Sequence, residues 1–360
     1  MSTDFSAFVG SGPVSARHRF DVEALDAWLT SHVDGYRGPL SVEQFAGGQS
    51  NPTYKLITPD RTYVMRAKPG SADKLLPSAH AVDREYRVMS ALAGTAVPVA
   101  QMYALCDDES VLGRAFYVME YVDGRVLWDP ALPGLSNAER EAVYDEMNRV
   151  IAALHRVDVE TVGLKDYGKP GDYLKRQIAR WTRQYRASET TQIDAMDRLI
   201  DWLPSAAQNV DATTERSAIV HGDFRLDNLL FAHDAPRVLA VLDWELSTIG
   251  DPLVDFSYHC MAWHIAPGQF RGIAGVDLAA LGIPDEASYI ARYQVRTGFD
   301  IPANWNLYLA YNMFRIAGIL QGIMKRVVEG TASSQQALEA GRAAAPMAEL
   351  GWRYALKAGA

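Results

Sequence analysis

The sequence predicts a mixed α+β protein whose first part is rich in strands and whose second part is mainly helical. Between residues 41 and 122, short β-like runs are separated by turn signals, and one helical segment stands among them. From about residue 125, apolar residues instead recur at helical spacing over long segments. The chain of 360 residues exceeds one average domain. We therefore expect a β-rich domain at 1–119 and an α-rich domain at 120–360.

The first domain is expected to begin with a helix and to continue as a mostly antiparallel sheet. Asp21 is the expected N-cap of that helix, because its carboxylate can accept hydrogen bonds from first-turn N–H groups. Pro59, Asp60 and Arg61 form a turn signal, which indicates a hairpin. The expected strands are 41–47, 53–58, 62–68, 99–107 and 114–122, with a helix over 79–94 inserted after the third.

The second domain is expected to be built from long helices around one short β segment. Ser136 is the expected cap of the first long helix, and apolar residues recur at helical spacing after it. The chain beyond residue 255 also has a mainly helical pattern. The other expected elements are helices over 171–186 and 191–203, and a short hairpin from 219–223, 228–231 and 237–244 that turns at 233–236.

Composition excludes several classes of protein. A net charge of -9 argues against a nucleic-acid-binding surface, which needs clustered Lys and Arg. The N-terminus lacks the pattern of a signal peptide, and no apolar run is long enough to span a bilayer. Cys106 and Cys260 have no metal-binding spacing and are expected to be buried thiols. We expect a soluble, cytoplasmic protein that is a monomer or a homodimer.

The stretch 219–231, IVHGDFRLDNLLF, places polar residues between two apolar runs. Transfer of a phosphoryl group needs a carboxylate that orients the acceptor hydroxyl, and oxygen ligands for metal ions that bridge the phosphates. Asp223 follows the first apolar run and can orient a hydroxyl, while Asn228 can reach a metal. Asp243 ends the apolar run VLAVL, and a hairpin would bring it to Asn228.

HGDFRLDNLL and VLDWELSTIGDPLVDFSY resemble the aminoglycoside phosphotransferase and choline kinase family, whose fold is two-lobed and protein-kinase-like. The resemblance covers roughly residues 40–330. RTYVMRAKPG and LLPSAHAVDREYRVMSAL are most similar to the phosphotransferase-type domain that some proteins carry fused to an acyl-CoA dehydrogenase. The resemblance implies that Asp223 is the catalytic base and that Asn228 and Asp243 bind the metal. It also implies that His221 holds the shape of the loop.

The turn FAGGQSN is the expected phosphate-binding turn. A Gly-Gly pair lets backbone N–H groups approach a phosphate closely, although the turn lacks the G-x-G-x-x-G pattern of protein kinases. The family has a similar turn, which strengthens the interpretation. The residues concerned are Gly47 and Gly48, with Gln49, Ser50 and Asn51 as side-chain donors.

The phosphate-binding cation is expected in the third strand of the sheet. The family usually has a lysine there, whereas this sequence has Arg66, and Lys68 two residues on points to the same face of a strand. We favour Arg66, since a guanidinium binds phosphate with two parallel hydrogen bonds. The resemblance makes Glu85 its acidic partner; the alternative for Glu85 is a solvated helix face.

The segment FYVMEYVDG resembles the family's connection between lobes. Met119 is expected to line the nucleotide pocket, and the backbone of Glu120 to Val122 to meet the adenine edge; the alternative is an edge strand without a ligand. Arg225, inside the loop, is expected to balance Asp223 or to meet a substrate anion.

Four acidic residues around the loop have less direct interpretations. Asp255 is expected to accept the loop's backbone N–H groups, and Asp251 to start a helix with Pro252. Glu245 is expected near a second metal or in hydrogen bonds around it, and Asp227 to be solvated or to cap the loop.

The predicted activity is that of a kinase that uses ATP, or GTP, with Mg²⁺ to phosphorylate a hydroxyl group of a small molecule. The subgroup resemblance favours a hydroxyacyl or hydroxy-acid acceptor. The alternatives are a true aminoglycoside phosphotransferase and a non-catalytic, kinase-like protein that binds a nucleotide or metabolite. The substrate pocket is expected in the α-rich domain, with candidate walls at Trp181, Tyr185, Tyr258, Trp263, Trp305 and Tyr308.

Overall fold

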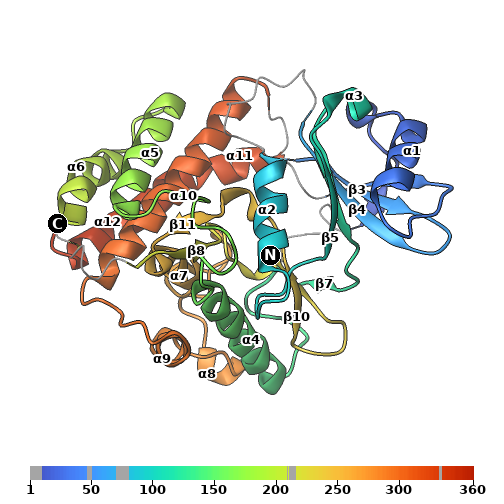
Figure 1. The fold of residues 1–360 in the computed structure, drawn as a ribbon. Coiled ribbons are helices and arrows are strands. Elements are labelled where there is room, and N and C mark those ends of the chain that lie inside the picture. Colours follow the sequence, from blue (N-terminus) through green and yellow to red (C-terminus); the bar gives the residue numbers. More distant parts are fainter. Residues whose placement is uncertain (1–9, 47–50, 70–80, 209, 211–215, 332–334) are drawn as a thin grey trace. The chain divides into compact units, whose positions relative to one another are not determined.

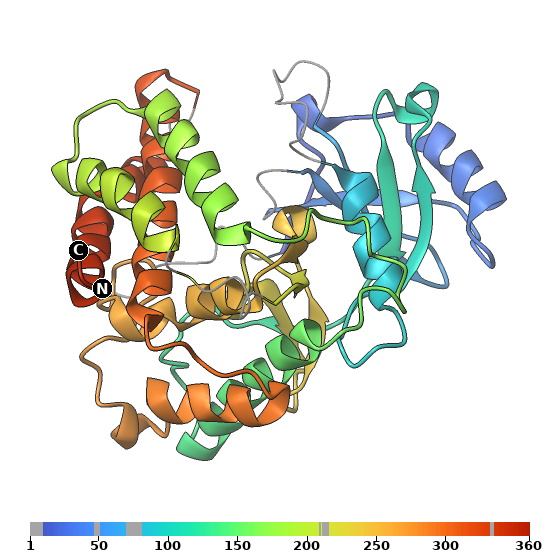
Figure 2. The ribbon, with the colours of Figure 1, turned by 60° about the vertical axis from the view of Figure 1, so that its left-hand side comes forward.

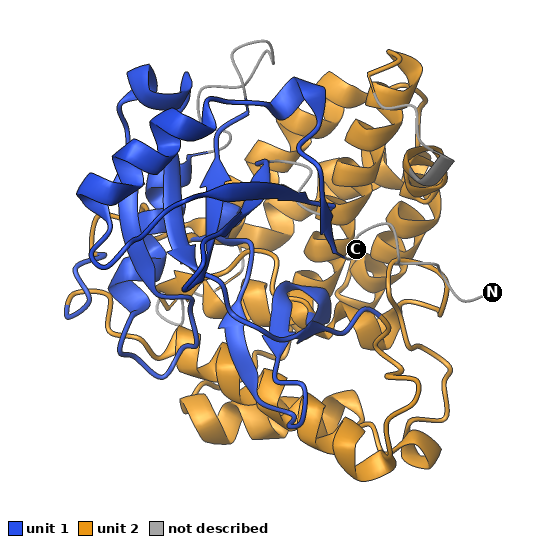
Figure 3. Ribbon diagram, turned by 90° about the vertical axis from the view of Figure 1, so that its right-hand side faces the viewer, with its two compact units in different colours: residues 1–128, 161–164, 226–247 blue, residues 129–160, 165–225, 248–360 orange. Residues whose placement is uncertain are grey.

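The computed structural model describes residues 10–46, 51–69, 81–208, 210, 216–331 and 335–360. The chain divides into two compact units, coloured separately in Figure 3. The first unit comprises 1–128, 161–164 and 226–247, and the second comprises 129–160, 165–225 and 248–360. The units therefore do not follow chain order, and the expected division between residues 119 and 120 stays a prediction.

The first unit contains the expected antiparallel sheet. Its strands are β1 (Ser11–Gly12), β2 (Ser41–Phe45), β3 (Thr53–Ile57), β4 (Thr62–Ala67), β5 (Met102–Cys106) and β6 (Phe116–Glu120), in the order β1-β2-β3-β4-β6-β5. The predicted β3–β4 hairpin is confirmed, with Ile57 paired to Thr62. Neither β1 nor the short helix α3 (Glu109–Leu112) was predicted.

Successive residues of β4 point to opposite faces of the sheet, as strand geometry requires. Tyr63 and Met65 join a buried apolar cluster with Leu25 and Leu29 of α1 (Val22–His32). The intervening Arg66 points to the other face, toward α2 (Val82–Leu92) and its buried Glu85. Figure 1 shows α1 and α2 on opposite sides of this sheet.

Local sequence explains where α1 begins and where α2 ends. The Asp21 carboxylate accepts a hydrogen bond from Ala24 N at 3.0 Å, which confirms the predicted N-cap of α1. Helix α2 ends before Gly94, whose φ of +79° lies in the left-handed region that favours glycine.

A second, three-stranded sheet completes the first unit. Strands β9 (Leu229–Phe231) and β10 (Val238–Val241) form the predicted hairpin, and β7 (Arg125–Val126) pairs with β9 on its other side. Gly124 allows this approach, because a Cβ there would lie 2.6 Å from the carbonyl oxygen of Phe231. The short 3-10 turns η3 (Leu226–Asn228) and η4 (Trp244–Leu246) flank the hairpin.

The second unit is mainly helical, as predicted. Figure 2 shows α10 running beside α5, α6 and α12. Its helices are α4 (Asn137–His155), α5 (Tyr173–Ser188), α6 (Asp194–Gln208), α7 (Pro252–Cys260), α8 (Leu278–Leu281), α9 (Glu286–Thr297), α10 (Trp305–Val328), α11 (Gln335–Arg342) and α12 (Ala344–Lys357). Ser136 and Glu139 form a capping box at the start of α4, which confirms the predicted cap.

The predicted hairpin over 219–244 is wrong for its first strand. Strand β8 (Ala218–Val220) pairs with β11 (Thr248–Gly250), which was not predicted, rather than with β9. The turn after β8 carries the chain out of the second unit before β9 begins in the first. Apolar strand runs indicate burial, but they do not identify the pairing partner.

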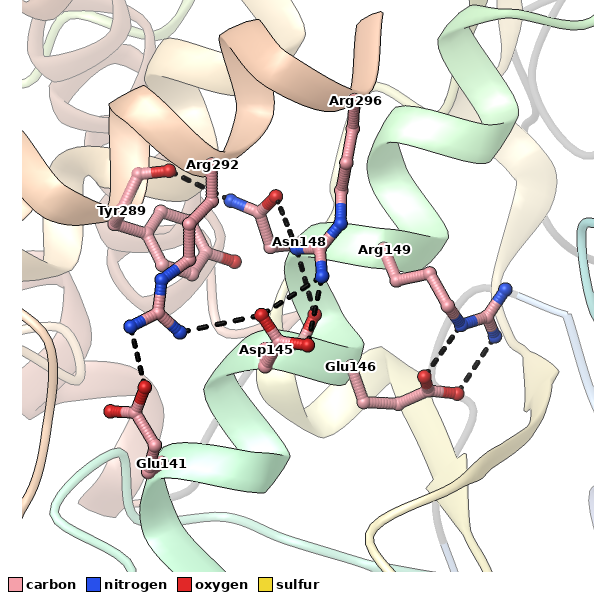
Figure 4. Close-up of polar contacts among 8 residues, drawn as sticks. All are labelled: Glu141, Asp145, Glu146, Asn148, Arg149, Tyr289, Arg292 and Arg296. Atoms are coloured by element: carbon pink, nitrogen blue, oxygen red, sulfur yellow. Dashed lines mark hydrogen bonds and ion pairs between the residues drawn. The ribbon is translucent and has the colours of Figure 1, made fainter.

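Ionic contacts join α4 to α9 (Figure 4). The Asp145 carboxylate lies 2.8 Å from Arg296 Nη2 and 3.3 Å from Arg292 Nη1. The Asn148 side chain accepts a hydrogen bond from Arg296 at 2.8 Å and donates one to the carbonyl oxygen of Tyr289 at 2.9 Å. This network fixes the relative position of two helices that stand far apart in sequence.

The two cysteines, Cys106 and Cys260, are free and buried, as expected. Burial raises the pKa of the Cys260 thiol well above its ordinary value, so this residue packs as a small apolar side chain. Of the helices that the described residues form, none combines the length and the apolar character needed to cross a membrane.

Candidate active site

The first unit contains a cleft with a volume of about 680 Å³, in the range of small-molecule sites. All of its lining residues belong to this unit. They include the sheet face opposite α1, residues 119–122 after it, and the ends of the β9–β10 hairpin. The cleft is thus built from segments that lie more than a hundred residues apart in sequence.

Arg66 is the cation of this cleft. Its Nη2 donates a hydrogen bond to Asp243 Oδ1 at 2.8 Å and lies 3.7 Å from Glu245 Oε2. Its Nε forms an ion pair with Glu85 Oε2 at 3.0 Å, although the geometry is not that of an aligned hydrogen bond. Burial alone would lower the pKa of Arg66, but Glu85 and Asp243 outweigh it and raise the pKa. The side chain therefore stays charged.

Glu85 is held by three partners and is 1% exposed, so the alternative of a solvated helix face is excluded. Besides Arg66, the phenol of Tyr117 donates to Oε2 at 3.0 Å, and the Asn51 amide donates to Oε1 at 2.9 Å. Burial raises the pKa of Glu85, and Arg66 opposes this shift. Tyr117 was missed by sequence reasoning, but it stands directly opposite Arg66 in the β4–β6 register.

Asn228 and Asp243 meet at the base of the β9–β10 hairpin, as their positions in the sequence predicted. Leu242 N donates to the carbonyl oxygen of Asn228 at 2.8 Å, and both Asn228 and Asp243 line the cleft. Asp243 has a left-handed backbone with a φ of +65°, which costs roughly 1–3 kcal/mol at a non-glycine residue. Such a conformation persists only where the surrounding contacts hold it.

Other predicted cleft residues are distributed as follows. Met119, Glu120 and Val122 line the cleft, but the N–H of Glu120 already donates to Gln101 O at 2.8 Å. Lys68 follows the end of β4, and it does not line this cleft in the described part of the chain. Gly47, Gly48, Gln49 and Ser50 lie outside the described residues.

The His-Gly-Asp turn belongs to the second unit, where Asp255 of α7 holds it. Asp255 Oδ2 accepts from His221 N and Oδ1 accepts from Gly222 N, both at 2.8 Å, as expected. Burial favours the neutral acid, but hydrogen bonding and the proximity of His155 and His221 lower the pKa of Asp255 overall. Asp251 caps α7 through Leu253 N at 2.8 Å, which confirms its expected helix-starting role.

His221 and Gly222 give the turn its shape. His221 is fully buried, and its Nδ1 accepts a hydrogen bond from Asp223 N at a distance of 3.1 Å. Gly222 has a φ of +82°, a conformation that glycine adopts without a steric penalty. A side chain at this position would strain the turn, so the glycine of HGD is required by geometry.

Both oxygens of the Asp223 carboxylate have partners in the second unit. The phenol of Tyr258, on α7, donates to Oδ1, and Arg225 Nη2 lies 3.1 Å from Oδ2. Each oxygen of a carboxylate can accept two hydrogen bonds. Tyr258 was expected only as a candidate pocket wall, and Asp227, expected as a solvated or loop-capping group, is buried and lines the cleft.

Within the described residues, no group of three or more His, Cys, Asp or Glu side chains could hold a metal ion. Asn228 and Asp243 instead offer two oxygen ligands, the type that Mg²⁺ prefers, and phosphate and water can complete its shell. The contact of the Arg66 guanidinium with Asp243 shows that this carboxylate already faces a cation. The ligand chemistry fits a magnesium ion that is held jointly by protein and phosphate.

The sequence matches the profile of the phosphotransferase enzyme family over residues 41–298. The chain belongs to this family. Mus musculus acyl-CoA dehydrogenase family member 10 is 46% identical over 351 residues, covering 96% of this chain and 32% of the relative. The chain therefore spans about a third of the length of this relative. The predicted family, and the similarity to a domain of acyl-CoA dehydrogenase relatives, are confirmed.

Solved structures agree with this assignment. A crystal structure from Ralstonia eutropha JMP134, named after the aminoglycoside phosphotransferases, is 68% identical, with a TM-score of 0.86 over 94% of this chain and 99% of that one. A thermostable mutant of the aminoglycoside phosphotransferase APH(4)-Ia, complexed with AMP-PNP and hygromycin B, is 17% identical, with a TM-score of 0.60 over 92% and 98%. The second likeness shows the fold alone, and the predicted kinase-like α+β fold is confirmed.

Proposed function

We propose that the protein is a kinase that transfers the γ-phosphoryl group of ATP to a hydroxyl group of a small molecule, with Mg²⁺ as the metal. The observation that carries the proposal is the convergence of Arg66, Asn228 and Asp243 on one cleft. A binding-only protein has no need for a phosphate cation next to two metal-binding oxygen ligands. The APH(4)-Ia complex with AMP-PNP supports a nucleotide as the occupant.

Each residue has a defined part in this proposal. Arg66, oriented by Glu85, binds phosphate oxygens, while Asn228 and Asp243 would hold the magnesium ion. When bound, the ion would neutralise negative charge on the phosphates. The backbone after Glu120 meets the adenine edge, since the Glu120 N–H is engaged with Gln101.

Asp223 orients the acceptor hydroxyl and takes its proton as the bond to phosphorus forms. Its distance from Asn228 along the chain is five residues, so backbone connectivity keeps the base and the metal ligand in one loop. His221 and Asp255 hold the turn that presents the carboxylate. Arg225, which pairs with Asp223, would meet an anionic group of the acceptor.

The acceptor is an acidic hydroxy compound, such as a hydroxy acid or a hydroxyacyl thioester with a phosphorylated carrier. Helix α5 supports this, because it carries five cationic residues and no acidic ones in a chain with a net charge of -9. In the described part of the chain, neither Arg180 nor Arg183 of α5 forms an ion pair. Arg315, in contact with Trp181 of α5 at 5.4 Å, links this helix to the turn that carries Asp223.

Thermal shift with ATP tests the nucleotide part of the proposal. ATP with Mg²⁺ should stabilise the protein more than ATP alone, because ligands that bind only the native state raise its stability. Asp243→Ala should abolish the extra effect of Mg²⁺ and leave the effect of ATP alone. An ATP-induced shift that is the same with and without Mg²⁺ would contradict the metal assignment.

A screen for ADP production over hydroxy acids, hydroxyacyl-CoA thioesters, choline and aminoglycosides tests the reaction. Asp223→Ala should lower kcat for the best acceptor by about 10²–10⁴-fold, the usual effect of losing a general base. Its thermal shift with ATP and Mg²⁺ should stay at the wild-type value, which separates catalysis from binding. Wild-type turnover in this variant would show that Asp223 is not the base.

A further inference from the structure

The contacts around Asp223 extend to Tyr258, which was expected only as a candidate pocket wall, and to Arg315, which the sequence did not single out. We propose that Tyr258 and Arg315 are positioning residues that hold the Asp223 carboxylate and its turn in the orientation needed for phosphoryl transfer. This inference rests on the proposed function, in which Asp223 orients the acceptor hydroxyl. It adds a mechanism by which two buried side chains of α7 and α10 control that residue.

Tyr258 holds one oxygen of the carboxylate. It projects from α7, is 3% exposed, and donates its phenolic hydrogen to Asp223 Oδ1. Burial and the adjacent Asp223 charge raise the pKa of Tyr258, so the phenol keeps the proton that it donates. The phenol contacts one carboxylate oxygen of Asp223, and Arg225 contacts the other, Oδ2. Together these two contacts favour a single orientation of the carboxylate about its side-chain bond.

Arg315 holds the backbone of the same turn. It projects from α10, is 7% exposed, and donates from Nη2 to the carbonyl oxygen of Gly222 at 2.5 Å. The N–H of Gly222 donates in the opposite direction to Asp255 Oδ1. Gly222, the residue immediately before Asp223, is therefore held through both its N–H group and its carbonyl oxygen.

Arg315 also supports Tyr258 directly. Its guanidinium lies 4.9 Å from the centre of the Tyr258 ring and 5.4 Å from that of Trp181. Among the described residues, no carboxylate forms an ion pair with Arg315, and its contacts include the carbonyl of Gly222 and two aromatic faces. Cation–π attraction of this kind is strongest where the cation is desolvated.

The two helices that carry these residues are themselves tied together. The Asn312 amide, one turn before Arg315 on α10, donates to Val254 O at 3.0 Å and to Ser257 Oγ at 2.8 Å on α7. Tyr258 follows Ser257, so a displacement of α10 would move both the ring and the guanidinium. The turn, α7 and α10 form one hydrogen-bonded assembly around Asp223.

A positioning role predicts a specific kinetic signature. Without the phenolic hydrogen, the carboxylate can rotate, and a smaller fraction of bound complexes has the acceptor hydroxyl in line for attack. The loss therefore falls on kcat, whereas the KM values for ATP and for the acceptor stay nearly constant. A purely structural role would instead lower the amount of folded protein without changing the kcat of what remains folded.

Tyr258→Phe tests this, since it removes one oxygen atom and keeps the ring beneath Arg315. We expect kcat for the best acceptor of the screen to fall about 10–100-fold, the effect of losing one hydrogen bond to a charged group. Both KM values should change by less than about twofold. The matched control is Tyr144→Phe, which deletes an equally buried phenol that donates to Pro130 O at 2.7 Å in the same unit.

The control variant should keep wild-type kcat, and both variants should lose similar amounts of thermal stability. Arg315→Lys keeps the charge but loses the planar group that contacts Gly222 and the two rings. Its kcat should therefore fall, as in Tyr258→Phe. In an Asp223→Ala background, Tyr258→Phe should have almost no further effect, because the phenol acts through the carboxylate.

Wild-type kcat in Tyr258→Phe, or equal losses in Tyr258→Phe and Tyr144→Phe, would overturn the inference. An undiminished effect of Tyr258→Phe in the Asp223→Ala background would also overturn it. Failure of the proposed function is recognised separately, by wild-type turnover in Asp223→Ala alone or by the absence of ADP production with every acceptor.

Discussion

Arg66 Nη2 donates to Asp243 Oδ1 at 2.8 Å, although the two residues stand 177 positions apart in the chain. The same guanidinium pairs with Glu85 at 3.0 Å. One side chain of β4 thus joins α2 to the segment that follows β10, and it fixes the acidic end of the cleft. A lysine at this position would supply a single ammonium group and could not reach both carboxylates in the same planar geometry.

Arg66→Met is expected to destabilise the protein strongly. The Glu85 side chain is 2% exposed, and the variant leaves its charge buried without the guanidinium, which typically costs about 3–5 kcal/mol. Urea unfolding followed by tryptophan fluorescence measures this loss. Adding Glu85→Gln should restore part of the stability, because the neutral amide no longer needs a cation.

The matched control is Arg149→Met, which breaks the pair with Glu146 on α4 (Figure 4). The Arg149 side chain is 41% exposed, so water already screens that pair and the loss should be about 0–1 kcal/mol. Equal losses in the two variants would mean that Arg66 contributes no more than a surface ion pair.

Charge reversal on α5 is expected to weaken the binding of an acidic acceptor. Arg180→Glu with Arg183→Glu should raise the KM for the acceptor at least about tenfold, because cations close to an anionic group are replaced by anions. The KM for ATP should stay near its wild-type value. Steady-state kinetics at two salt concentrations measure the effect, which should shrink as salt screens the charges.

Arg353→Glu with Lys357→Glu on α12 changes the net charge by the same amount on two exposed side chains. This control should leave the KM for the acceptor unchanged. A loss of the same size in both double variants would show that overall charge, and not α5, determines acceptor binding.

His259 is expected to make the protein less stable in acid. Burial lowers the pKa of this histidine from 6.5 to about 4, so the unfolded chain takes up a proton between these values and the folded protein does not. The stabilisation is complete above pH 6.5 and is lost as pH falls toward 4. At pH 5 the wild type should have lost about 2 kcal/mol through this group relative to pH 7.

His259→Gln removes the titrating group and keeps a hydrogen-bonding partner for the Tyr289 phenol, 2.7 Å from His259 Nε2. Urea unfolding measures how much the free energy of unfolding falls between pH 7 and pH 5. This fall should be about 2 kcal/mol smaller in the variant than in the wild type. Parallel pH profiles for the two proteins would show that His259 titrates normally in the fold.

Much of the fold could be predicted from local patterns. The N-caps at Asp21 and Ser136, the β3–β4 hairpin and the mainly helical character after residue 255 depend on residues within a few positions of one another. The pairing of β8 with β11 could not be predicted, because each strand has only three residues and β11, with the sequence TIG, lacks a strand pattern of its own. Strand β7 could not be predicted either, because it has only two residues.

Some residues of the candidate site could be found from the sequence, and others only from the structure. His221, Asp223 and Asn228 were found because they lie in one short stretch between apolar runs. Glu85 was found only through a family resemblance, and its burial is a property of the packed sheet. Arg315 was missed, since nothing in the apolar pattern of α10 distinguishes a buried arginine that meets Gly222 from one that points to water.

The sequence by itself determined most of the long helices and strands, which family the chain belongs to, and which loop carries the carboxylate and the amide. These properties follow from spacing, because backbone geometry relates neighbours in sequence in a fixed way. Tertiary structure decided that Arg66, and not Lys68, meets Glu85 and Asp243. It also decided that Asp223 receives a phenol 35 positions away, and that a guanidinium 93 positions away holds the preceding glycine. Such contacts depend on how whole elements pack, which no local spacing encodes.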